Sequence, residues 1–100
     1  MARLSIYEVR FRARSSDELV EDPAGHLGAV LEVMPGIARS LGADHDAGSL
    51  TVTGTFELEV ARGMAVAARD SSRLAKEALK LAGMGDARLV ELTIALRQAR

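Results

Sequence analysis

Apolar and polar residues alternate along three stretches of this chain, and two stretches with a longer repeat separate them. The alternating stretches span about residues 4–14, 49–59 and 88–98. A repeat of two sends successive side chains to opposite faces of a sheet, so each stretch predicts a strand with one buried and one polar face. The apolar positions define the predicted inner face of the sheet: Tyr7, Val9, Phe11, Val52, Phe56, Leu58, Val90, Leu92, Ile94 and Leu96.

The first helix is predicted to follow the first strand. It starts at Asp22 and Pro23, because aspartate is a preferred N-cap residue and proline is tolerated at the first helical position. The Pro-Gly pair at residues 35–36 should end or kink this helix. Ile37 and Leu41 are expected to add a last turn that packs on the core.

The second half of the chain predicts a hairpin, a helix and the last strand. Residues 43–46 are interpreted as a short edge strand, joined to the next strand by a tight turn at Ala47 and Gly48. Over residues 61–83 the apolar repeat becomes helical, and Gly83 suits the helix end. If residues 43–46 formed a loop, the fold would instead be a three-stranded α/β sandwich.

The predicted order is strand, helix, strand, strand, helix, strand, over one domain of residues 1–100. This order resembles the ferredoxin-like α/β plait, an α+β fold. The resemblance implies an antiparallel sheet with strands in the spatial order fourth, first, third, second, and both helices on one face. It covers nearly the whole chain but rests on topology, so it carries no functional residue with it.

Composition narrows the function classes. The chain contains no cysteine, which excludes disulfides, thiolate catalysis, iron–sulfur clusters and cysteine–zinc sites. The formal net charge of -1 argues against nonspecific binding to nucleic acid or membrane, which usually needs a basic excess. No apolar leader opens the chain and no apolar run approaches the roughly 20 residues of a membrane span. We therefore expect a cytoplasmic protein, without a cofactor.

Arg10, Arg12 and Arg14 form a row on the predicted open face of the first strand. One interpretation is a face that binds an anion or a partner. RNA-binding sheets also present aromatic side chains for bases to stack on, and this open face has none. The other interpretation is a solvated face whose charges pair across strands, with Glu91 near Arg12 or Arg14 and Arg97 near Glu8.

Metal and ligand sites receive little support from the sequence. Asp44, His45 and Asp46 carry ligand atoms, but in a strand His45 points away from both aspartates. His26 has no evident partner for acid–base chemistry. Gly54 falls on the inner face, where we interpret it as allowing a close approach or marking a bulge.

The sequence does not state a function, and three function classes stay open. The first is a non-enzymatic module that self-associates into a dimer or larger oligomer, through the last strand, the open sheet face or both. Its basis is an apolar last strand at a sheet edge, with no proline, inward charge or bulge signal to protect it. The residues that would form this edge are Leu89, Val90, Leu92 and Ile94. The second is a small-molecule-binding protein of the dimeric α/β-barrel kind, with or without enzymatic activity. The third is a ligand-sensing regulatory domain.

Overall fold

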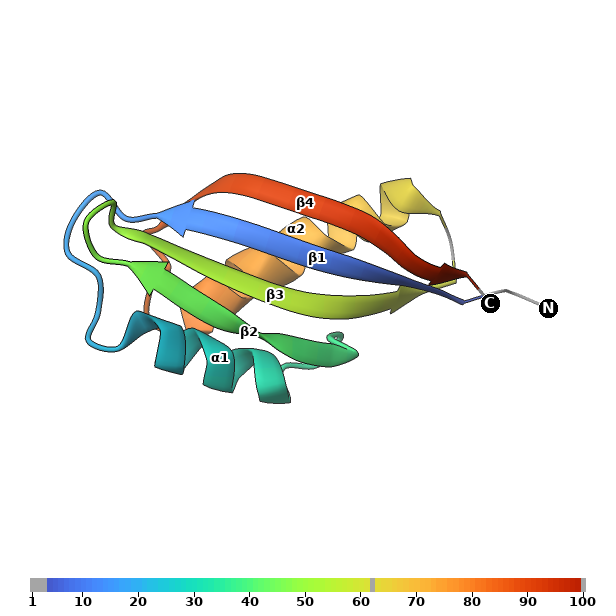
Figure 1. Cartoon of the computed structure of the whole chain (residues 1–100), viewed down its shortest axis with the longest axis horizontal. Helices are drawn as coiled ribbons and strands as arrows, with labels where there is room; N and C mark the ends of the chain where they lie inside the picture. The colour runs from blue at the N-terminus through green and yellow to red at the C-terminus, as the bar shows by residue number, and fades with distance from the viewer. Residues whose placement is uncertain (1–3, 62, 100) are drawn as a thin grey trace.

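The protein folds as a ferredoxin-like plait, described here from a computed structural model that places residues 4–61 and 63–99, with side chains to residue 97. Four antiparallel strands and two helices form two layers (Figure 1). No described helix combines the length and apolar character that crossing a membrane requires. The elements in chain order are β1 (Ser5–Arg14), α1 (Pro23–Val33), β2 (Arg39–Asp46), β3 (Thr51–Val60), α2 (Met64–Leu81) and β4 (Arg88–Ala99).

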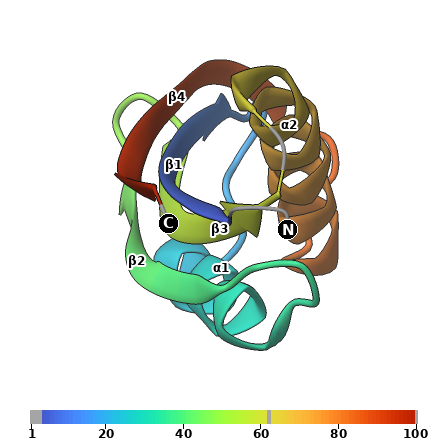
Figure 2. The ribbon, with the colours of Figure 1, turned by 90° about the vertical axis from the view of Figure 1, so that its right-hand side faces the viewer.

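The sheet has the strand order β2-β3-β1-β4, which is the predicted order read from the other edge. Both helices lie behind the sheet in Figure 1, and the view along the long axis shows the strongly curved sheet partly enclosing them (Figure 2). The opposite face of the sheet carries neither of the two described helices. The predicted fold is therefore confirmed, and the three-stranded alternative is wrong because residues 43–46 belong to β2.

The core lies between the sheet and the two helices. Phe11 and Phe56 are fully buried and meet edge to face, with ring centroids 6.2 Å apart. Leu27 and Leu31 from α1 and Leu74 from α2 belong to the same core, each at most 2% exposed. The alternation in β1 and β3 thus sends the predicted apolar residues inward, as expected.

The second strand is longer than predicted, since β2 begins at Arg39 rather than Ala43. A register shift between Ser40 and Gly42 leaves Leu41 as an extra residue. This bulge breaks the repeat of two, which is why the sequence did not indicate the first half of the strand. Leu41 therefore lies in a strand and is 39% exposed, so its predicted place in a last helical turn is wrong.

Two further bulges interrupt β4, where the sequence contains no bulge signal. The first leaves Val90 without a direct partner on β1, so that Leu89 rather than Val90 pairs with Ala13 on the inner face. Leu89 packs against the core, whereas Val90 is 49% exposed, which reverses their predicted positions. The second bulge leaves Arg97 without a direct partner on β1. An edge strand tolerates such insertions because only one neighbour constrains its register.

The segment ends follow local backbone chemistry. Asp22 caps α1 as predicted, and its side chain accepts a hydrogen bond from the Gly25 backbone N–H. Gly83 follows α2 with φ at 82°, a conformation that glycine adopts without steric cost. The β2–β3 connection is four residues long rather than the predicted tight turn, and its positive φ falls on Leu50 rather than Gly48.

Ser71 is fully buried in α2, and its hydroxyl has no hydrogen-bond partner among the described residues. A buried, unsatisfied hydroxyl is destabilising, and serine is a poorer helix former than alanine. We expect Ser71→Ala to raise the free energy of unfolding by about 1 kcal/mol, measured by urea denaturation. The matched control is Ser72→Ala, one position along at a partly exposed site, which should yield only the smaller gain from helix propensity. Equal effects in the two variants, or a loss in Ser71→Ala, would contradict this.

Candidate functional site

The candidate interaction site begins with the edge position of β4. This strand pairs with β1 on one side, and no described strand lies on its other side. The bulges at Val90 and Arg97 delimit a regular segment, residues 91–96, in which each residue has a direct partner on β1. An unpaired edge of this length presents a row of backbone donors and acceptors. The free edge is therefore shorter than the sequence indicated, but it is regular.

Apolar side chains lie next to this edge on the helix side of the sheet, and we call Leu92, Ile94 and Leu96 the β4 apolar strip. Leu92 and Ile94 pair with the fully buried Phe11 and Val9, yet they are only half-buried themselves. Leu96 is 53% exposed. Exposure thus increases from β1 to β4 on the same face, because the helix layer covers β1 and leaves the edge strand partly uncovered.

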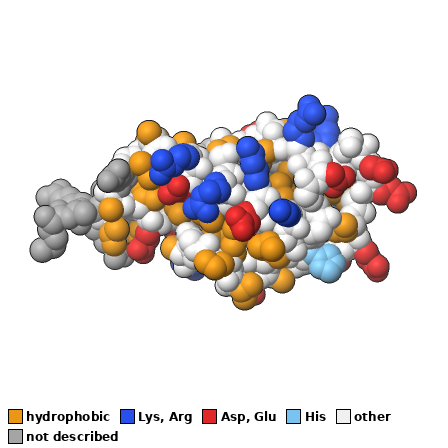
Figure 3. Space-filling model, turned by 180° about the vertical axis from the view of Figure 1, so that it is seen from behind, with side chains coloured by type: hydrophobic (Ala, Val, Ile, Leu, Met, Phe, Trp, Pro, Cys, Tyr) orange, Lys and Arg blue, Asp and Glu red, His pale blue; other side chains and the backbone are white. Residues whose placement is uncertain are grey.

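Other exposed apolar side chains are dispersed over the surface. Val33 and Leu81 end their respective helices and are 80% and 61% exposed. Figure 3 shows the helix side of the molecule, where basic, acidic and apolar side chains are interspersed rather than gathered into one large patch. Single exposed apolar residues are common on soluble proteins. The β4 apolar strip differs because its members follow one strand beside an open edge.

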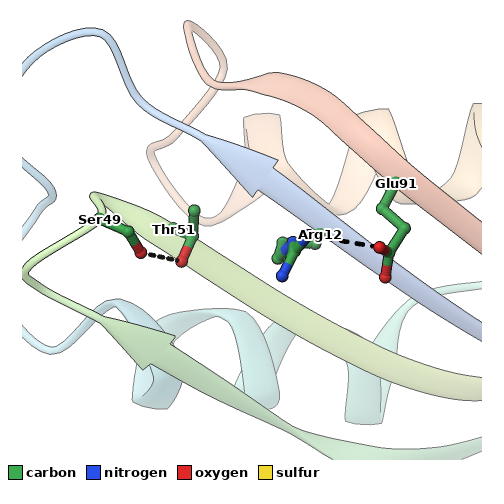
Figure 4. Close-up of polar contacts among 4 residues, drawn as sticks. All are labelled: Arg12, Ser49, Thr51 and Glu91. Atoms are coloured by element: carbon green, nitrogen blue, oxygen red, sulfur yellow. Dashed lines mark hydrogen bonds and ion pairs between the residues drawn. The ribbon is translucent and has the colours of Figure 1, made fainter.

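Among the described residues, the open face of β1 and β4 carries two ion pairs across the strands, and both were predicted from the sequence. The Arg12 guanidinium lies 3.3 Å from the Glu91 carboxylate, between residues that are direct strand partners (Figure 4). Arg97 of β4 lies 3.8 Å from Glu8 of β1. All four side chains are at least one-third exposed, so each pair contributes modestly to stability. Arg12 is thus engaged within the chain.

The other two arginines of the predicted row have different surroundings. Arg10 and Arg14 are exposed and form no ion pair among the described residues. Threonines of β3 line the open face beside the row, with Arg10 opposite Thr55. Arg14 stands directly opposite Arg88 of β4. The three arginines therefore do not form one uniform surface.

Arg88 was missed by the sequence reasoning. A continuous repeat of two through β4 would have placed Leu89 opposite Arg14, and only the bulge at Val90 brings Arg88 there. No local sequence signal marks this bulge, since it contains neither glycine nor proline. The juxtaposition of two arginines is consequently visible in the structure alone.

The histidine and aspartate residues considered for metal binding do not converge. In β2, His45 pairs with the inner-face residue Val52, whereas Asp44 pairs with Thr53 on the open face. In the part of the chain that the structure describes, no group of three or more His, Cys, Asp or Glu residues could hold a metal ion. His26 is exposed in the first turn of α1.

No family model matches the chain, and no curated protein matches it. Functional conclusions therefore depend on the surface geometry of the chain itself.

Proposed function

We propose that this protein is a non-enzymatic self-associating module, a homodimer formed by pairing β4 with β4 of a second copy. The observation that supports this is the open, regular edge at residues 91–96 beside the partly uncovered β4 apolar strip. Strand addition at such an edge gains backbone hydrogen bonds for affinity and side-chain contacts for specificity. In the dimer, two four-stranded sheets become one continuous sheet.

A specific register makes the edge complementary to itself. In an antiparallel pair centred on Ile94, this residue faces its own copy, and Leu92 faces Leu96 of the second copy. Both contacts lie on the helix side, so the strip is covered by an identical strip. On the open face, the same register places Glu91 opposite Arg97 of the second copy. Every contact away from the axis occurs twice, as in any twofold interface.

The charge pattern favours a second copy over an unrelated partner. Within one chain, Glu91 already pairs with Arg12, and Arg97 pairs with Glu8. The proposed register adds the contact between Glu91 and Arg97 of the second copy, which links these pairs into a row of alternating charges. Cross-strand pairs of opposite charge contribute roughly 0.2–1 kcal/mol each, so their main effect is to select the register.

The alternative suggested by the sequence, a ligand cavity between two facing sheets, requires an apolar open face. Here that face carries arginines, glutamates and threonines, such as Arg10, Glu57 and Thr55. Burying such a face against a second sheet would leave polar groups without hydrogen-bond partners, which costs free energy. This composition supports edge pairing over face-to-face association.

Leu96→Lys tests the interface. Light scattering coupled to size exclusion should give the parent protein twice the mass of one chain, and the variant a single-chain mass. The lysine would face Leu92 of the second copy in a dimer, whereas in a monomer this position is 53% exposed and tolerates charge. Circular dichroism should show that the variant remains folded.

The matched control is Val33→Lys, the same kind of change at an 80% exposed position in α1, away from the β4 edge. This control should remain dimeric. A monomeric parent across a wide concentration range would contradict the proposal. A dimeric Leu96→Lys protein would show that the dimer forms elsewhere.

Charge reversal tests the register itself. Glu91→Arg and Arg97→Glu should each weaken dimerisation several-fold, because each places like charges opposite one another across the axis. The double variant restores opposite charges between the two copies. Its new contacts with Arg12 and Glu8 are repulsive, but equally so in the monomer and in the dimer. Its dimer dissociation constant should return toward that of the parent. Additive weakening would exclude this register.

A further inference from the structure

A hollow of about 400 Å³ lies where β1 ends and β4 begins, at the opposite end of β4 from Leu96. Its position beyond the bulge separates it from the regular edge segment that pairs in the proposed dimer. Its size falls in the range of small-ligand sites. The lining residues are Arg14, Ser15, Ser16, Asp86, Arg88 and Val90.

The two arginines of this hollow are brought together at a cost. They are direct partners across the β1–β4 pair, and like charges in this position are destabilising. Neither has a carboxylate within ion-pair distance among the described residues. Asp86 also lines the hollow, so its three charged groups leave an excess of one positive charge. An unfavourable juxtaposition without evident compensation within the fold is typical of a functional position.

Two serines, Ser15 and Ser16, line the same hollow and carry hydroxyl groups. Ser15 is only 5% exposed, and its backbone is held by the hydrogen bond from its N–H to the Leu50 carbonyl, at 2.9 Å. Its hydroxyl accepts a hydrogen bond from the Asp17 backbone N–H. This is the single side-chain hydrogen bond of Ser15 among the described residues, which leaves its O–H available to donate.

We infer that this hollow binds the phosphate group of a small molecule, held between Arg14 and Arg88 with the Ser15 hydroxyl as a further donor. Guanidinium groups present fixed forks of N–H donors that match phosphate oxygens in pairs. The donor residues belong to two strands and the loop that follows β1. Three donor groups can be shared among the several oxygens of a phosphate, whereas a carboxylate offers only two oxygens. The bound anion would also relieve the repulsion between the two arginines. This inference is independent of the proposed dimer.

Titration with inorganic phosphate at low ionic strength tests the site. Binding is measured by calorimetry and by changes in amide chemical shifts. The parent should bind saturably, with shifts concentrated at residues 14–16 and 86–90. Arg88→Gln should weaken binding by about tenfold or more, as expected for the loss of a charge-assisted contact. The matched control is Arg12→Gln, which changes the net charge equally on the same face and should leave the affinity within about twofold.

Absence of saturable phosphate binding by the parent would overturn the inference. Equal weakening by the two variants would overturn it as well, because it would indicate diffuse electrostatic attraction. Acetate binding as tightly as phosphate would overturn the assignment to phosphate. A thermal melt supplies a second readout, since phosphate should raise the Tm of the parent more than that of Arg88→Gln. Arg14→Gln should reproduce the loss of binding, and unchanged affinity there would also contradict the site.

Discussion

Replacing Phe11 by alanine is expected to lower the free energy of unfolding by about 3–5 kcal/mol, the largest loss anticipated for a single side chain here. Phe11 is fully buried, and its ring contacts Phe56 edge to face. Its removal would leave a cavity in the centre of the core, since Gly54 opposite it has no side chain that could fill the space. Small domains have only about 5–15 kcal/mol of stability in total, so this variant should be close to unfolding. Denaturant unfolding followed by circular dichroism measures the loss.

The control for this prediction is the next residue along the strand. Arg12→Ala should cost at most about 1 kcal/mol, because the Arg12 side chain is 47% exposed and its ion pair with Glu91 is solvated. Two adjacent residues of β1 should thus differ several-fold in their contribution to stability. Similar losses in both variants would contradict the assignment of Phe11 to the core and Arg12 to the open face.

The sequence predicted the fold wherever the repeat of two was uninterrupted. In the β1–β3 pair every residue from Ser5 to Arg14 has a direct partner, without a register shift. These two central strands are constrained on both sides and covered by helices, so burial selects their alternating pattern. The helix ends at Asp22 and Gly83 were also predictable, because capping depends on local residue chemistry.

The errors in strand register all fall on the two edge strands. Bulges at Leu41 in β2 and at Val90 in β4 shift the pattern by one residue, and a shift of one sends a side chain to the other face. The periodicity therefore mispredicted the start of β2 and exchanged the positions of Leu89 and Val90. An edge strand has one neighbour, so its bulges depend on tertiary fit rather than on a local signal.

The same distinction explains what the sequence could indicate about the candidate sites. The pairing of Arg12 with Glu91 follows from strand order and an unshifted register, so it was predictable, and the structure contains it. The edge position of β4 followed from the topology alone. The opposition of Arg14 and Arg88 depends on a bulge, and the uncovered β4 apolar strip depends on how far the helix layer extends across the sheet. Neither can be derived from a repeat of two.

Gly54→Ala should lower the free energy of unfolding by about 1–3 kcal/mol, although it adds a single methyl group. A Cβ atom at this position would lie 2.6 Å from two ring atoms of Phe11 and 3.2 Å from a methyl of Leu27 in α1. Both neighbours are fully buried, so neither ring nor helix can move without disturbing the core. Gly54 thus permits the close approach expected from the sequence, and no register shift occurs there.

The matched control is Gly28→Ala, at an interior position of α1 where an added Cβ would meet its nearest neighbour, Ala43, at an ordinary 3.9 Å. This substitution should stabilise the protein by roughly 0.5–1 kcal/mol, because alanine loses less backbone entropy in a helix than glycine. The same chemical change should therefore have opposite signs at the two positions in denaturant unfolding. Two losses, or two gains, would contradict the packing described for Gly54.

A double-mutant cycle that combines Gly54→Ala with Phe11→Leu identifies the neighbour responsible. Leucine lacks the outer ring atoms that the added methyl group would meet, so the double variant should lose at least about 1 kcal/mol less than the sum of the two single losses. The interaction energy comes from unfolding curves of the parent, both single variants and the double variant, measured under one set of conditions. Strictly additive losses would show that contact with Leu27, rather than with the Phe11 ring, requires glycine at this position.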